Sequence, residues 1–148
     1  MWGGVGRGKS YLMDIFFSSL NFTSKKRLHF HEFMQDVHNE LAHCADRSDP
    51  LSVVADYWAS DVRVICLDEF QVSDITDAML LGRLLEYLFL KGVTIVATSN
   101  DSPDSLYSQG LQRDRFLPAI ELIKIHNVVL QIGGDTDYRL RTLESAAV

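Results

Sequence analysis

Cysteine is scarce in this 148-residue sequence, which contains only Cys44 and Cys66. Neither belongs to a C-x-x-C pair, so the spacing of a zinc site or a redox pair is lacking. Both fall within apolar patterns and are expected to be small buried hydrophobes in a reducing compartment. No apolar run is long enough to cross a bilayer, and no secretory signal opens the sequence. We therefore expect a cytoplasmic protein with no integral membrane segment.

Basic residues are also in short supply, because 14 Lys and Arg face 20 Asp and Glu, for a formal net charge of -6. Little positive charge is left to neutralise phosphates, so we expect no direct binding of nucleic acid. The single run of three basic residues, at 25–27, is interpreted as a solvated turn before a strand. His29, His31 and His38 lack the i, i+4 spacing of a helical zinc site, which favours packing or surface roles.

Length and composition indicate one globular domain over residues 1–148, since no repeat or linker divides the chain. Helical periodicity predicts helices from Ser10 to Leu20, from His31 to Cys44, after a cap at Asp74 as far as Gly92, and over 114–126, with a further helix start at Ser102–Pro103. Short apolar runs predict strands at 25–30, 62–67, 93–97 and 128–132, and the polar segment 46–50 predicts a loop. This alternation predicts an α/β fold with a parallel sheet.

The strongest motif lies at residues 3–10, which match the pattern G-x-x-x-x-G-K-[ST] of a P-loop. Glycines let backbone N–H groups converge on phosphates, and the helix that follows points its positive N-terminal end at the same anion. We expect Lys9 to reach the β- and γ-phosphates of ATP, and the Ser10 hydroxyl to bind Mg²⁺. A glycine-rich turn that matches by chance is the alternative. The expected nucleotide-binding residues are Gly3, Gly4, Val5, Gly6, Arg7, Gly8, Lys9, Ser10 and Tyr11.

A pair of acidic residues, Asp68 and Glu69, ends the predicted strand at 62–67. In open α/β sheets ligands bind outside the carboxyl ends of the strands. Asp68 is therefore expected to hold Mg²⁺, and Glu69 to orient or deprotonate the attacking water. Acidic residues also end many buried strands without a function, but beside a P-loop the catalytic interpretation is preferred. The pair favours hydrolysis over kinase chemistry, and the strand end at 98–101 lacks the N-K-x-D motif of GTPases.

Three more polar residues complete the predicted catalytic set. Asn100 ends the next strand, at the position called sensor 1 in AAA+ proteins, and can hydrogen-bond the γ-phosphate or the lytic water; a simple turn residue is the alternative. Arg113 and Arg115 stand near the start of the last predicted helix. Either can act as an arginine finger on the nucleotide of a neighbouring subunit, whereas solvated surface arginines are the alternative.

Several of these runs resemble the ZapE (AFG1-like) family of AAA+ ATPases. The most distinctive is LDEFQVSDITDAM at 67–79, and the others are MWGGVGRGKSYLMD at 1–14, RLHFH at 27–31, ATSN at 97–100, GLQR at 110–113 and DYR at 137–139. The resemblance covers essentially the whole chain. The Gly-Arg-Gly form at 6–8 is similar to the bacterial branch of the family rather than to its mitochondrial homologues.

The resemblance implies a three-layer AAA+ core, hydrolysis of Mg²⁺-bound ATP, a homo-oligomer, and a role in cell division with FtsZ as a candidate protein partner. It favours Arg113 as the finger, with Arg115 as second choice. It also implies a strand before the P-loop and a C-terminal lid, so we expect 1–148 to be a core fragment truncated at the first strand and lacking the lid. Ser10 stands where threonine is commoner in the family. A helicase-loader-type AAA+ protein and a non-catalytic fragment remain the alternatives.

Overall fold

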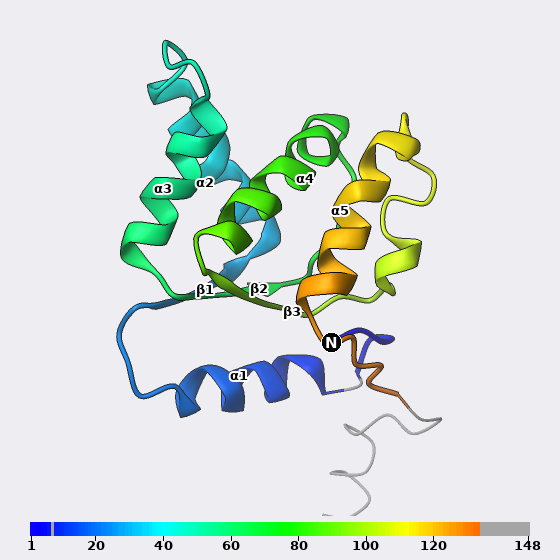
Figure 1. The fold of residues 1–148 in the computed structure, drawn as a ribbon. Helices are drawn as coiled ribbons and strands as arrows, with labels where there is room; N and C mark the ends of the chain where they lie inside the picture. Colours follow the sequence, from blue (N-terminus) through cyan, green and yellow to red (C-terminus); the bar gives the residue numbers. More distant parts are fainter. Residues whose placement is uncertain (7, 134–148) are drawn as a thin grey trace, which may run out of the picture.

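The computed structural model describes residues 1–6 and 8–133. In this part of the chain a parallel sheet has the order β1 (Lys25–His29), β2 (Val64–Asp68), β3 (Thr94–Ala97). Helix α1 (Lys9–Ser19) covers one face of the sheet, and the other helices cover the opposite face (Figure 1). These are α2 (Phe30–His43), α3 (Pro50–Asp61), α4 (Ile75–Leu90) and α5 (Arg113–His126), with a short 3-10 helix, η1 (Pro103–Ser105). The predicted three-layer α/β architecture is confirmed.

Strand β2 forms the centre of the core, because its side chains are buried on both faces of the sheet. Ile65 and Leu67 belong to the large cluster formed with the four helices above the sheet. Val64 and Cys66 point to the other face, where they pack with Met13 of α1. This two-sided burial explains why the sequence of β2 is a continuous apolar run rather than an alternating one.

Helix α3 is absent from the elements predicted above, although its sequence carries the signals of a helix. Asp49 caps it by accepting a hydrogen bond from the backbone of Ser52, and Pro50 occupies the first turn. Its buried residues recur at helical spacing: Leu51, Val54, Ala55 and Trp58. The loop predicted at 46–50 therefore ends where this helix begins. The helix start predicted at Ser102–Pro103 is a single 3-10 turn.

The strand predicted at 128–132 is reduced to an isolated bridge, which pairs with the first residues of the chain. Trp2 bridges Gln131 on one side and Ser99 on the other, both in parallel. The backbone N–H of Trp2 donates to the carbonyl of Leu130 over 2.9 Å, and the N–H of Ile132 donates to the carbonyl of Trp2 over 2.7 Å. The start of the chain thus lies between the end of β3 and residues 130–132, at the point where the P-loop leaves the sheet.

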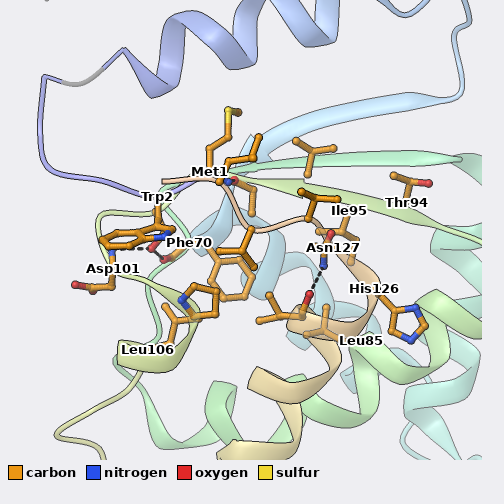
Figure 2. Close-up of a pocket in the computed structure, with 18 of the residues that line it drawn as sticks. Met1, Trp2, Phe70, Leu85, Thr94, Ile95, Asp101, Leu106, His126 and Asn127 are labelled. Carbon is orange, nitrogen blue, oxygen red and sulfur yellow. Dashed lines mark hydrogen bonds between the residues drawn. The ribbon is translucent and has the colours of Figure 1, made fainter. Parts of the chain in front are cut away.

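A cavity of about 650 Å³ continues from Met1 along the edge of β3 that faces away from β2 (Figure 2). Its lining includes the outer edge of β3, side chains of α1, α4 and α5, the segment after β3, and residues 127–130. The ammonium group of Met1 donates to the carbonyl of Ala97 over 2.8 Å. Within residues 1–6 and 8–133, no backbone hydrogen bond reaches this edge of β3 before Ala97. Over residues 94–96 this edge of β3 therefore faces the cavity in the described part of the chain.

Candidate nucleotide-binding site

The loop at residues 3–8 carries the left-handed backbone that its glycines permit. Gly6 and Gly8 have φ angles of 78° and 83°, which other residues rarely adopt. Gly8 is the N-cap of α1, and its carbonyl accepts the N–H of Leu12 over 3.0 Å. The first turn of α1 therefore begins inside the motif. Its backbone N–H groups lack partners within the helix, which is the property that lets a helix N-terminus bind an anion.

Position 3 requires glycine for a different reason, because the backbone of Ile132 leaves no space for a side chain there. A Cβ atom at this position would lie 2.0 Å from the carbonyl oxygen of Ile132. The backbone N–H of Gly3 donates to the carbonyl of Ser99 over 3.1 Å. The loop is thus anchored at its first residue between the segment after β3 and the segment that reaches Ile132. The glycine predicted for phosphate binding also fixes where the loop starts.

Lys9 folds back over the loop that precedes it. Its Nζ atom donates to the carbonyl of Gly3 over 2.6 Å and to that of Gly4 over 2.8 Å. The ammonium group is therefore held at the loop, where a phosphate would compete with these carbonyls for it. Ser10 and Tyr11 are exposed on the first turn of α1. Arg7, which the motif also predicts to bind nucleotide, lies outside the described residues.

Asp68 lies at the end of β2, with 13% of its side chain exposed, and is held by Arg27 of the neighbouring strand. Nε of Arg27 donates to Oδ2 of Asp68 over 2.7 Å, and Nη2 donates to Oδ1 over 3.2 Å. These hydrogen bonds raise the pKa of Arg27 above its usual value. The interpretation of 25–27 as a solvated turn is wrong, because these residues form the start of β1 and the guanidinium is needed beside a buried carboxylate.

Glu69 has a left-handed backbone, with a φ angle of 54°, directly after the strand. Its N–H donates to the hydroxyl of Thr98 over 3.1 Å, and the next N–H, of Phe70, donates to the Thr98 carbonyl over 2.7 Å. The side chain of Glu69 is 78% exposed, and its Oε2 lies 3.7 Å from Nδ1 of His29. The turn thus places the Glu69 carboxylate outside the carboxyl end of β2, where solvent reaches it.

Thr98 and Ser99, which follow β3, connect the two predicted motifs. The hydroxyl of Thr98 fixes the backbone of Glu69, and the carbonyl of Ser99 accepts from Gly3 at the start of the loop. Asn100 is the next residue and is exposed. The structure therefore gathers the loop, the acidic pair and Asn100 at neighbouring strand ends, the usual position of a ligand site in such sheets. Sequence reasoning missed Thr98, whose buried hydroxyl has no local sequence signal.

The model of the AFG1-like ATPase family matches residues 1–148. The chain belongs to the AFG1-like ATPase family. Over 146 residues it is 58% identical to the cell division protein ZapE of Escherichia coli (strain K12), an alignment that covers 99% of this chain and 39% of that protein. The AFG1-like chain described here therefore spans well under half the length of this curated relative.

Solved structures with a similar fold are P-loop NTPases. A protein from Streptococcus pyogenes serotype M3, provisionally described as a primosome component, superposes with a TM-score of 0.58 and 27% identity, over 90% of this chain and 66% of its own. DnaA from Aquifex aeolicus, bound to AMPPCP, superposes with a TM-score of 0.60 and 15% identity, over 98% of this chain and 43% of its own. The AFG1-like chain thus has the P-loop NTPase (AAA+) fold.

The two candidate finger arginines of the AFG1-like chain have different surroundings. Nη2 of Arg113 donates to the carbonyls of Asp104 and Leu106, over 2.6 and 3.4 Å, and its buried Nε has no partner among the described residues. Arg115 is exposed, and its Nη1 donates only within its own turn, to Oε1 of Gln112 over 3.2 Å. No contact within the described residues joins either arginine to Lys9, Asp68 or Glu69.

The ring of Tyr107 determines the conformation of the GLQR run at 110–113, which leads into α5. A Cβ atom on Gly110 would lie 2.1 Å from the ring of Tyr107, so a larger residue cannot fit under it. The hydroxyl of Tyr107 donates to the carbonyl of Leu111 over 2.8 Å. Tyr107 and Gln112 both have left-handed φ angles of 56°. This compact turn fixes the direction in which α5, and with it Arg113, leaves the 3-10 helix.

Proposed function

We propose that this chain is the nucleotide-binding core of an AAA+ ATPase, and that the complete protein binds and hydrolyses Mg²⁺-bound ATP. The observation that carries the proposal is the pair of hydrogen bonds from Gly3 to Ser99 and from Glu69 to Thr98. They join the phosphate-binding motif and the acidic motif through two consecutive residues. The description of the family as ATPases and the P-loop NTPase fold support the same chemistry.

The residues of the site fit both ATP and Mg²⁺. Lys9 supplies a point charge held at the loop, and the start of α1 supplies backbone N–H groups for the phosphates. The hydroxyl of Ser10 and the carboxylate of Asp68 are hard oxygen donors of the kind that Mg²⁺ prefers. When bound, Mg²⁺ would neutralise charge on the β- and γ-phosphate oxygens. The bidentate grip of Arg27 holds the Asp68 carboxylate in one orientation before any cation arrives.

Glu69 is the proposed general base. Its carboxylate is exposed beyond the strand end while its backbone is fixed by Thr98, so it can orient a water molecule and accept its proton. Asn100, which lies three residues after the end of β3, would hydrogen-bond the γ-phosphate or that water. Arg113, or Arg115 as second choice, would stabilise the transition state in a neighbouring subunit of a homo-oligomer.

Release of phosphate by the complete protein tests this proposal. We expect turnover that requires both ATP and Mg²⁺, and that falls to background in Lys9→Ala. A matched control is Lys25→Ala, which removes a lysine bound to the backbone of Phe17 and Leu20 at the far end of α1. That variant should retain turnover. A wild-type protein without Mg²⁺-dependent turnover, or a Lys9→Ala variant as active as wild type, would contradict the proposal.

A role in bacterial cell division is proposed from the relative's description as a cell division protein. The cytoplasm as its location and FtsZ as its partner are proposed from the family resemblance carried by the sequence motifs. Among the described helices, none has the length and apolarity to cross a bilayer. Co-sedimentation of the complete protein with FtsZ filaments, with and without ATP, tests the partnership. Binding to the filaments that depends on ATP is the expected result, and equal pelleting without FtsZ would contradict it.

A helicase-loader-type function is the second candidate, favoured by one observation: the similar Streptococcus pyogenes protein is described as a primosome component. The net charge of -6 weighs against direct nucleic-acid binding. Binding of the complete protein to single-stranded DNA, tested at two salt concentrations, separates the two functions. The third alternative, a non-catalytic fragment, is tested by a nucleotide titration of residues 1–148, and nucleotide binding by this chain would count against it.

A further inference from the structure

Arg27 occupies both oxygens of the carboxylate that is the candidate Mg²⁺ ligand. It lies on β1, where strand pairing places it opposite Cys66 and places His29 opposite Asp68. From this position its side chain reaches forward to the end of β2, where Nε and Nη2 each hold one oxygen of Asp68. A cation bound by Asp68 must therefore share this carboxylate with the guanidinium or take an oxygen from it.

The same guanidinium has a second anion within reach. Its Nη1 forms an ion pair with Oδ1 of Asp14, which stands on α1 one turn after Ser10. The two carboxylates differ in burial, because 13% of the Asp68 side chain is exposed but 63% of that of Asp14. Arg27 thus bridges the P-loop helix and the buried carboxylate, across the strand and helix layers seen in Figure 1.

This ion pair balances the negative charge of the buried Asp68 carboxylate. A buried carboxylate without a compensating charge is costly, and a bidentate arginine is the strongest substitute for a metal ion that a side chain offers. The guanidinium can keep its ion pair with the exposed Asp14 when Asp68 binds a cation. Release from Asp68 therefore does not leave the Arg27 charge unpaired.

We propose that Arg27 competes with Mg²⁺ for the carboxylate of Asp68. When Mg²⁺ binds Asp68, the guanidinium leaves this carboxylate and keeps its ion pair with Asp14. This inference rests on the proposed nucleotide-binding function. It makes Arg27 a positioning residue that sets the Mg²⁺ concentration at which the site is half-occupied. A purely structural ion pair would leave that requirement unchanged.

The test is a Mg²⁺ titration of the complete protein at a fixed concentration of a fluorescent, slowly hydrolysed ATP analogue. For Arg27→Gln the Mg²⁺ midpoint should fall by up to about fivefold, which corresponds to the upper end of what an exposed ion pair contributes. Arg27→Lys keeps the charge but cannot grip both oxygens, so its midpoint should fall by less. Nucleotide binding without Mg²⁺ should change little in either variant.

The matched control is Asp14→Asn, which removes the resting place of the guanidinium and should raise the midpoint. In the double variant Arg27→Gln/Asp14→Asn the midpoint should return to that of Arg27→Gln alone, because the effect of Asp14 acts through Arg27. A midpoint that stays equal or rises in Arg27→Gln overturns the inference. If that variant fails to fold, an unchanged midpoint in Arg27→Lys does the same. A wild-type protein that shows no Mg²⁺-dependent binding overturns the proposed function as well.

Discussion

The backbone N–H of Glu69 donates to the hydroxyl of Thr98 over 3.1 Å. Thr98 is 3% exposed, so its hydroxyl is shielded from water, and its own carbonyl accepts from Phe70. These two hydrogen bonds hold Glu69 in a left-handed conformation that its side chain would otherwise disfavour. The proposed base is thus positioned by the segment after β3, which also anchors the loop at residues 3–8 through Ser99.

Thr98→Val keeps the shape of this buried side chain but removes the acceptor. This hydrogen bond is partly buried, so leaving the Glu69 N–H without a partner should lower the free energy of unfolding by about 1 kcal/mol, the low end of the cost for a buried group. Because Glu69 loses its anchor, ATP turnover should fall about tenfold or more while nucleotide affinity is retained. Urea unfolding and phosphate release measure the two effects. Thr98→Ser, which restores the hydroxyl, should recover most of both, and equal turnover in the two variants would contradict the role of Thr98.

The buried strand β2 and the acidic pair at its end are predictable from sequence, because a short, β-branched apolar run that ends in charge is typical of a strand covered on both faces. The left-handed loop at residues 3–8 is predictable because its glycines lie in one short motif that leads into a helix. Asp74 is predictable as a helix cap, and its side chain accepts from Thr76 and Asp77 as such caps do. In each case the interaction that matters lies within a few residues of the motif.

The contacts of Thr98 and Arg27 cannot be predicted in the same way, because their partners are distant in the sequence. The separation is 29 positions for Thr98 and Glu69, and 41 positions for Arg27 and Asp68. Each depends on which strands are neighbours and in what register, and a single sequence does not contain that information. Helix α3 was missed for a different reason. Its spacing of buried residues and its Asp49–Pro50 cap are present in the sequence, but the polar segment before it, taken alone, favours a loop.

Arg113 and Arg115 can be separated by mixing inactive variants. Arg113→Ala should leave nucleotide affinity nearly intact and reduce turnover, by about 10³-fold or more for an arginine finger. A mixture with Lys9→Ala should recover activity if the finger acts on the neighbouring subunit. The contacts of Arg113 with the carbonyls of Asp104 and Leu106 provide a second readout, because Arg113→Ala should also lower the melting temperature.

Arg115→Ala is the matched comparison, since Arg115 bonds only within its own turn and its loss should not affect stability. If Arg115→Ala loses turnover and complements Lys9→Ala while Arg113→Ala does not, Arg115 is the finger. Failure of both arginine variants to complement Lys9→Ala, despite demonstrated co-assembly, would contradict an arginine acting between subunits.

The ammonium group of Met1 predicts a pH dependence of stability in a chain that starts at this residue. Burial, together with the charge of Lys9, lowers its pKa below the ordinary value of 8.0. Below pH 8 the unfolded chain therefore binds more protons than the folded one, so the free energy of unfolding should rise as the pH rises toward 8. The stabilisation is complete above pH 8 and is lost as the pH falls through the lowered pKa.

N-terminal acetylation isolates this effect, because it removes the charge but keeps an N–H that can donate to Ala97. The acetylated chain should be more stable than the free one at pH 6, and the difference should vanish near pH 9. Chemical denaturation at the two pH values makes the comparison. A difference that is independent of pH would show that the ammonium group does not experience the burial seen here.

Binding of a slowly hydrolysed ATP analogue in the presence of Mg²⁺, compared between Lys9→Ala and Glu69→Gln in the complete protein, tests the central claim most directly. Lys9 is held at the proposed phosphate-binding loop, whereas the Glu69 side chain lies beyond the strand end and is proposed to serve only the chemical step. We predict that Glu69→Gln binds the analogue about as tightly as wild type, although it does not turn over ATP, and that Lys9→Ala binds it at least about tenfold more weakly, as expected when a charged contact is lost. Equal loss of affinity in the two variants, or unchanged affinity in Lys9→Ala, would contradict the account.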